Sequence, residues 1–346
     1  MDILLSSGSL AVTILVGLVA LAILVLSSDH AVTRFVGLAK YFNLSATFMG
    51  MTVLSLATSI PEITSHATAS VNILTGNMDY EVASSIVLGS NIGSDVVQQT
   101  LIMGLVVFLS GVLYFRRYFL WKSMIPMIAT TVMCIIFGLD GIYSRLDGGI
   151  LFGTFILYTY YLYWDERKFF KKEENTEEQE ETKGPQNRKE ALIYALFALG
   201  AMALTILSAQ IVLQVTEKIV EVTNVGGSLI GVLTLGIASA LPEFTTAMSG
   251  IRRKAAGVSL GTLVGSNITN PLVAIGGGAL ISTYWVPGPL VKWDLPWETV
   301  TGMILWAILW FTKGRLNRTA AIYLIVLYFV YIGCRALFFS VDTSLI

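Results

Sequence analysis

Two glutamates stand inside apolar segments of the sequence, where a carboxylate is costly. Glu62 lies in the run ATSIPEITS and Glu243 in IASALPEFTT, each directly after a proline. A charged side chain at the centre of a membrane helix costs about 2.5–3.5 kcal/mol on insertion scales. Each proline also removes a helical hydrogen bond and so frees a backbone carbonyl one turn earlier. Carboxylates beside free carbonyls suit a hard cation such as calcium, which binds six to eight oxygens.

A second polar motif follows each glutamate. The runs LGSNIGSD and VGSNITNP place Ser90 and Ser94, and likewise Ser266 and Asn270, four residues apart on one helix face. Their hydroxyl and amide groups are candidate auxiliary ligands, while a role in helix packing remains an equal alternative for each serine. The glycine before each serine permits close helix approach.

These motifs belong to an internal repeat. Residues 43–65 align with 224–246 at a constant offset of 181, and the Gly-Ser-Asn runs align at an offset of 176. Each half contains five predicted helices, an odd number, so the two halves enter the membrane in opposite directions. Inverted repeats with interrupted helices are typical of secondary transporters, whose sites lie near the membrane midplane at the repeat interface. We therefore expect Glu62 and Glu243 to face each other across a pseudo-two-fold axis.

The composition indicates a membrane protein. Of 346 residues, 55% are hydrophobic and 13% charged, with a mean hydropathy of +0.72, whereas soluble domains carry about 25% charged residues. The net charge of −1 excludes a polybasic nucleic-acid binder. We predict an all-α polytopic membrane protein with ten transmembrane helices arranged as two inverted five-helix repeats. The predicted apolar segments are 9–28, 44–74, 82–112, 119–139, 148–164, 190–215, 226–250, 256–284, 297–312 and 317–340.

Loop charges orient this topology. The loops on one side of the membrane carry 18 Lys and Arg residues, and those on the other side carry three. The positive-inside rule then places both termini outside the cytoplasm of a cell membrane. The predicted divisions are a first repeat (1–164), a charged cytoplasmic linker (165–189) and a second repeat (190–346). The linker contains an acidic run. We interpret it as a solvated connection between the two repeats, with a calcium-sensing role as the alternative.

The motif pairs ATSIPE/GSNIGS and IASALPE/GSNITN resemble the two alpha-repeats of the cation/calcium exchanger superfamily, particularly its prokaryotic-type sodium/calcium branch. The alpha-1 motif covers 50–100 and the alpha-2 motif 231–275. The resemblance implies that both Pro-Glu glutamates bind calcium, each aided by the backbone carbonyl four residues earlier, and that nearby polar residues supply sodium or auxiliary ligands. The implied metal-binding residues are Glu62, Glu243, Thr58, Ser239, Ser59, Ser90, Ser94, Ser266 and Asn270.

The sequence departs from that family pattern in its oxygen donors. Ala240 stands where the first repeat keeps Ser59, and Ser94 and Asn270 stand where relatives often carry an acid. Fewer oxygens and charges leave open either proton coupling or a smaller number of sodium ions. Asp95 and the neighbouring Gln98 and Gln99 are possible substitutes, with helix packing as the alternative.

The resemblance implies a secondary active antiporter that exchanges calcium for sodium by alternating access. The alternatives are a proton/calcium antiporter that uses the same glutamates, and a calcium-permeable channel. We predict no enzyme activity, because a nucleophile–base pair is not apparent and no HExxH motif is present. No cofactor and no nucleic-acid partner are expected; the partners are the lipid bilayer and inorganic cations, and the chain is expected to work as a monomer.

Overall fold

A computed structural model describes residues 10–41, 49–115, 120–169, 184–223, 225–252 and 256–345. Within these ranges the helices form ten rods, five in each half of the chain, with π-helical turns labelled η. The first half contains α2 (Leu10–Tyr41), then η1 (Met49–Leu54), α4 (Ser55–Thr58) and α5 (Ile60–Thr75), then α6 (Tyr80–Val97), η2 (Gln98–Ile102) and α7 (Met103–Ser110), then η3 (Leu120–Met124) and α9 (Ile125–Gly138), and finally α10 (Arg145–Phe169).

The second half repeats this order. It contains α11 (Arg188–Thr223), then α12 (Gly227–Gly231), η5 (Val232–Gly236), α13 (Ile237–Ser239) and α14 (Leu241–Arg252), then α15 (Ala256–Thr269), η6 (Asn270–Ile275) and α16 (Gly276–Ser282), then η7 (Leu290–Asp294) and α17 (Leu295–Phe311), and finally α18 (Arg318–Phe338). The predicted helical fold with two five-helix repeats is thus confirmed, since every irregular turn of the second half has a counterpart in the first.

The described ranges also contain four very short strands, which the all-helical prediction did not include. The strands are β1 (Val112–Tyr114), β2 (Ile142–Tyr143), β3 (Tyr284–Trp285) and β4 (Arg315–Asn317). β1 pairs antiparallel with β4, and β2 with β3. Each pair joins a loop of one repeat to a loop of the other, so the loops after the third and ninth rods share one end of the molecule. The loops after the fourth and eighth rods share a common end as well.

Five helical stretches are by length and composition apolar enough to cross a membrane within the described ranges. They are Tyr80–Ser110, Leu120–Gly138, Arg188–Thr216, Gly227–Met248 and Arg318–Phe338. The second rod is interrupted by polar residues, and α10 contains several tyrosines. These features lower their mean hydropathy or length without removing them from the ten-rod arrangement.

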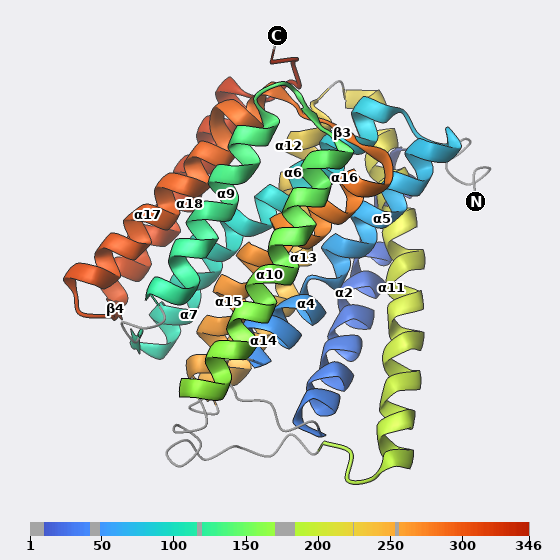
Figure 1. Cartoon of the computed structure of the whole chain (residues 1–346). Helices are drawn as coiled ribbons and strands as arrows, with labels where there is room; N and C mark the ends of the chain where they lie inside the picture. The colour runs from blue at the N-terminus through green and yellow to red at the C-terminus, as the bar shows by residue number, and fades with distance from the viewer. Residues whose placement is uncertain are drawn as a thin grey trace.

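The first rods of the two repeats, α2 and α11, pack along each other at one side of the molecule (Figure 1). Leu15, Leu18 and Leu196 on these helices are about 60% exposed, at 61, 59 and 60%. Exposed leucines at this density indicate a lipid-facing surface. α10 ends at Phe169 and α11 begins at Arg188, so both helices extend into the predicted linker 165–189, whose acidic run lies outside the described residues.

The Gly-Ser-Asn helices cross into the opposite repeat. α6 packs against α12 and η5, while α15 packs against η1 and α4. The approach is close: a β-carbon built on Gly93 would lie 2.8 Å from the Cα of Val232, and one built on Gly265 would lie 3.0 Å from the Cα of Met51. Glycine is therefore required at these crossings, and the crossings bring the polar motifs of both repeats to the centre of the molecule.

Candidate functional site

The site is built on two helix interruptions near the middle of the molecule, between α4 and α5 and between α13 and α14 (Figure 1). Ser59 has φ −78° and ψ 6°, and its counterpart Ala240 has φ −81° and ψ −5°, so the backbone at both repeat positions has a ψ well above the usual helical value of about −42°. α5 then begins at Ile60, has Pro61 as its second residue and carries Glu62 in its first turn. Glu243 lies in the first turn of α14.

This placement favours the two carboxylates electrostatically. The N-terminus of a helix carries about half a positive charge together with unsatisfied N–H groups. Each interruption creates such an N-terminus in the interior, where an intact helix would have none. The preceding halves end at Thr58 and Ser239, so the carbonyl end of a helix also lies at each interruption. The broken helices therefore supply both the setting for a buried acid and oxygens for a cation.

Both glutamates are buried, with Glu62 at 1% and Glu243 at 0% exposure. Ser94 Oγ donates to Glu62 Oε1 at 2.8 Å, and Ser266 Oγ donates to Glu243 Oε1 at 3.3 Å. The other carboxylate oxygen, Oε2, has no hydrogen-bond partner in either residue. Each glutamate thus keeps one oxygen occupied by a serine of its own repeat and one oxygen open.

The two half-sites meet. Thr58 Oγ1 and Ser266 Oγ, from different repeats, are 3.2 Å apart. Thr58 also interacts with the carboxylate of Glu243, and Ser239 with that of Glu62. The carboxylates of Glu62 and Glu243 themselves are close enough to repel each other. The structure therefore brings both predicted glutamates, both predicted hydroxyl residues before the prolines, and Ser94 and Ser266 into one cluster.

The remaining predicted residues lie around this cluster in different ways. Ser59 is fully buried and its Oγ has no hydrogen-bond partner. Asn270 donates from Nδ2 to Asp95 Oδ1 at 2.6 Å, and its Oδ1 is unpartnered. Ser90 is buried at the helix crossing, where its backbone carbonyl would be 2.9 Å from a β-carbon on Gly236. For Ser90, close helix packing is therefore an observed role.

A layer of buried polar side chains lies beside the glutamates; it contains Gln98 and Gln99, named above as possible ligands, together with Asn267 and Glu298, which were not predicted. Gln99 Nε2 donates to Asn267 Oδ1 at 2.8 Å, and Asn267 Nδ2 donates to Gln98 Oε1 at 3.0 Å. Glu298 is 2% exposed and accepts from Thr131 Oγ1 at 2.6 Å. Glu298 lies at the start of the predicted apolar segment 297–312, a position where a charged residue ordinarily meets the membrane surface, so its burial was not predicted. Asn267 could have been predicted, because both Gly-Ser-Asn motifs contain an asparagine at this position.

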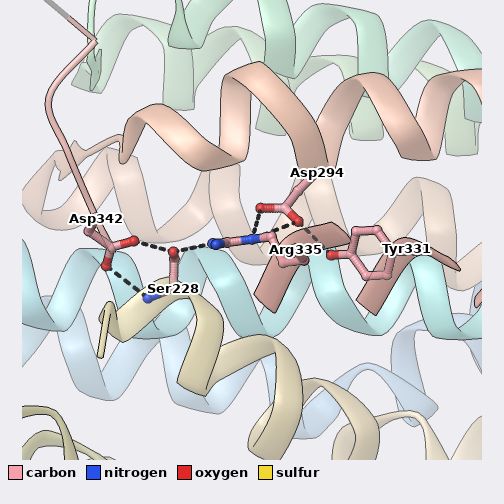
Figure 2. A network of polar contacts seen from close by, with 5 residues as sticks. All are labelled: Ser228, Asp294, Tyr331, Arg335 and Asp342. Carbon is pink, nitrogen blue, oxygen red and sulfur yellow. Dashed lines mark hydrogen bonds and ion pairs between the residues drawn. The ribbon is translucent and has the colours of Figure 1, made fainter. Parts of the chain in front are cut away.

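A buried ion pair connects η7 with α18 (Figure 2). Arg335 Nε donates to Asp294 Oδ2 at 2.9 Å, with both side chains fully buried. Tyr331 donates to Asp294 Oδ1 at 2.6 Å, and Arg335 Nη2 donates to Ser228 Oγ at 2.5 Å. Ser228 also donates its backbone N–H to Asp342 Oδ2 at 3.0 Å. This network ties η7, α18 and the C-terminal segment to the start of α12, the helix that leads to Glu243.

The donor chemistry of the site fits a hard cation. Within the described ranges no three or more His, Cys, Asp and Glu side chains are grouped to hold a metal ion. A cation at Glu62 and Glu243 would instead combine two carboxylates with hydroxyl, amide and backbone oxygens. Oxygen donors of this kind suit calcium and similar ions, and they do not suit softer transition metals.

The fold and the site define a polytopic helical membrane transporter built from inverted repeats. The sequence model of the family described as "Sodium/calcium exchanger protein" matches residues 12–164 and 193–336. The chain therefore belongs to the sodium/calcium exchanger family. Its members are transporters and not enzymes; the run GVSLG at 257–261 formally matches the GxSxG hydrolase pattern, but it lies inside α15 and not at a strand-to-helix turn.

Individual relatives cover most of the chain. An uncharacterized membrane protein of Methanocaldococcus jannaschii is 25% identical over 316 residues, which are 91% of this chain and 95% of the relative. The sodium/calcium exchanger MaX1 of Methanosarcina acetivorans is 25% identical over 308 residues, covering 77% of this chain and 82% of the relative. The structure of the sodium-calcium exchanger NCX_Mj matches with a TM-score of 0.63 at 21% identity, over 93% of this chain and 97% of that protein. The last match supports the fold.

Proposed function

We propose that this chain exchanges calcium for sodium across a cell membrane by alternating access, with Glu62 and Glu243 as the shared carboxylates of the transport site. The observation that carries the proposal is the symmetric pair of buried carboxylates, each with Oε1 held by a serine and Oε2 unpartnered. Thr58, Ser239, Ser59, Ser94, Ser266 and Asn270 would provide further oxygens, and Ser90 would hold the crossing helices together. A sodium/calcium exchanger among the relatives supports the choice of ions.

The charge of the site explains why exchange would be favoured over leak. Two carboxylates give the empty site a charge of −2, which one calcium ion or two sodium ions would neutralise. Burying the unpaired charges during a switch from one side to the other costs several kcal/mol. Loaded states therefore switch readily and the empty state does not. A channel would instead need a continuous path with weaker binding at several positions.

Orientation and organisation belong to the same proposal. The basic loops after the odd-numbered rods would face the cytoplasm, so the termini would be extracytoplasmic and the linker 165–189 cytoplasmic. The repeats 1–164 and 190–346 would move against each other around the central site, within a single chain.

Reconstituted liposomes provide the test. We expect an outward sodium gradient to drive calcium uptake without a pH gradient and in the presence of a protonophore. Glu62→Gln and Glu243→Gln should each abolish uptake while the protein stays monodisperse in detergent. Uptake driven by a pH gradient and unaffected by sodium would favour the proton/calcium antiporter. Calcium flux that needs no opposing gradient of either ion would favour the channel.

A further inference from the structure

A third buried carboxylate, that of Asp95, lies beside the glutamate site. Asp95 is 1% exposed, and its Oδ1 accepts the 2.6 Å hydrogen bond from Asn270 Nδ2. Asn91 stands one helical turn before Asp95 on the same face of α6. Asn91 Nδ2 donates in turn to the backbone carbonyl of Asn270 at 3.4 Å. Asp95, Asn91 and Asn270 therefore form one cluster, hereafter the Asp95 cluster, between α6 and the start of η6.

Two oxygens of the Asp95 cluster are left without partners. Asn91 Oδ1 and Asn270 Oδ1 have no hydrogen bond, although both residues have 0% exposure. Leaving a buried amide oxygen unpaired costs about 1–3 kcal/mol, and such a group in a native structure calls for a bound ion or water. A ligand that accepts electron pairs from both oxygens would remove this cost.

The repeat provides an internal comparison. Asn267 is the counterpart of Asn91 in the second Gly-Ser-Asn motif, and its Oδ1 accepts a hydrogen bond from Gln99 Nε2 at 2.8 Å. Asn267 Nδ2 is also satisfied, by Gln98 Oε1 and by the backbone carbonyl of Leu263. The asparagine at this repeat position therefore has its side-chain oxygen hydrogen-bonded in the second repeat and unpartnered in the first. The copy whose amide oxygen has no partner, Asn91, is the one in the Asp95 cluster.

The surroundings of the Asp95 cluster are negatively charged. The carboxylates of Glu298, Glu62 and Glu243 all lie close enough to repel Asp95. Among the lysines and arginines of the described ranges, Arg335 is the one that is buried, and it is already paired with Asp294. A calcium ion on the glutamate pair would neutralise those two acids, and Asp95 would keep its hydrogen bond from Asn270.

We propose that Asp95, with the side-chain oxygens of Asn91 and Asn270, forms a second cation position that takes one sodium ion in the sodium-loaded state. One carboxylate matches the charge of one monovalent ion. The amide oxygens of Asn91 and Asn270 can coordinate a metal cation but do not bind a proton near neutral pH, so a sodium ion would use all three residues whereas a proton would bind Asp95 alone. This inference rests on the proposed function and adds a sodium position that shares Asn270 with the proposed transport site and includes two residues, Asp95 and Asn91, that the site does not.

Asp95→Asn tests the proposal because it removes the charge and keeps the shape. Two fluxes are compared in liposomes: calcium–calcium tracer exchange without sodium, which needs the glutamate pair, and sodium-driven calcium uptake. We expect tracer exchange to stay within about twofold of the unaltered protein and sodium-driven uptake to fall about tenfold or more, as expected for loss of one charged ligand. The number of sodium ions needed per calcium should fall by one.

The double variant Asp95→Asn/Asn270→Asp is the matched control. It moves the carboxylate across the existing 2.6 Å hydrogen bond and keeps one acid and one amide in the pair. We expect it to recover most of the sodium-driven uptake. Sodium-driven uptake unchanged in Asp95→Asn would overturn the proposal, and so would equal loss of both fluxes. A loss of pH dependence at unchanged sodium dependence would assign the position to a proton and would also overturn it.

A binding measurement separates this inference from the proposed function. Thermal melting of the detergent-solubilised protein in sodium is compared with melting in choline. We expect sodium to raise the Tm of the unaltered protein more than that of Asp95→Asn. If the unaltered protein shows no calcium flux but this difference persists, the proposed exchange is wrong and the sodium position stands. An equal sodium-dependent rise in both proteins rejects the sodium position.

Discussion

The charge of Arg335 is tolerated in the interior because several partners surround it. Its Nε contacts both oxygens of Asp294, at 3.1 and 2.9 Å, and its Nη2 reaches Ser228 (Figure 2). Desolvating two charges costs several kcal/mol for each ion, and the attraction between them offsets this cost only with good geometry and further hydrogen bonds. Tyr331 supplies such a bond to Asp294. Removing either charge would leave the other one buried and uncompensated.

We therefore predict that Arg335→Met lowers the free energy of unfolding by about 3–5 kcal/mol, the usual effect of breaking a buried pair. Adding Asp294→Asn to this variant should restore most of the loss, because no charge then stays buried alone. Thermal melting in detergent of both single variants and the double variant measures the coupling. Additive losses in the double variant would show that the two residues stabilise the protein independently.

Among individual residues, those that occur at the same position in both repeats could be predicted from the sequence. Glu62 and Glu243 stand out because both copies place a carboxylate at the same apolar position. Glu298 and Arg335 each occur once and lie near the ends of predicted apolar segments, where charges ordinarily meet the membrane surface. Their burial depends on which rod packs beside them. A single sequence does not contain that information.

Among the elements, the Gly-Ser-Asn helices determine how the repeats fit together. α6 and α15 each cross the interrupted rod of the opposite repeat, and glycines lie at both crossings. The repeat motifs predict these elements and their small residues. The π-helical turns η1, η2, η5 and η6 that border the site were not predicted, because a π-turn keeps the same apolar periodicity in the sequence as a kinked α-helix.

The crossing of α6 over α12 gives a prediction for Gly89. A β-carbon there would meet backbone atoms of Ser228, which cannot move aside as a flexible side chain would. We expect Gly89→Ala to lower the free energy of unfolding by about 1–3 kcal/mol through overpacking. Gly153→Ala, where a β-carbon meets nothing within 4 Å, is the control and should be neutral or stabilising by up to about 1 kcal/mol. Equal melting temperatures for the two variants would contradict the close approach.

For the molecule as a whole, the strand pairs test the inverted topology independently of hydropathy. β1 pairs with β4, so the loops after the third and ninth rods lie together, while β2 and β3 hold the loops after the fourth and eighth rods at a common end. The first pair of loops contains Lys313 and Arg315 and is followed by Arg318, the first residue of α18, while Arg145, the first residue of α10, follows a loop of the second pair. Charge asymmetry and strand pairing therefore divide the loops in the same way, although the two signals have different physical origins.

Cysteine labelling in intact cells would assign these ends to the two sides of the membrane. In a chain with Cys134→Ala and Cys334→Ala, we expect Asp140→Cys to react with a membrane-impermeant maleimide from outside. Lys313→Cys should react only after permeabilisation, because the positive-inside rule places the basic end in the cytoplasm. Asp140 and Lys313 are both exposed, so the difference in labelling would report the side of the membrane and not burial. Labelling of Lys313→Cys in intact cells, with Asp140→Cys protected, would reverse the orientation and leave the fold unchanged; labelling of both would contradict the opposite placement of the two ends.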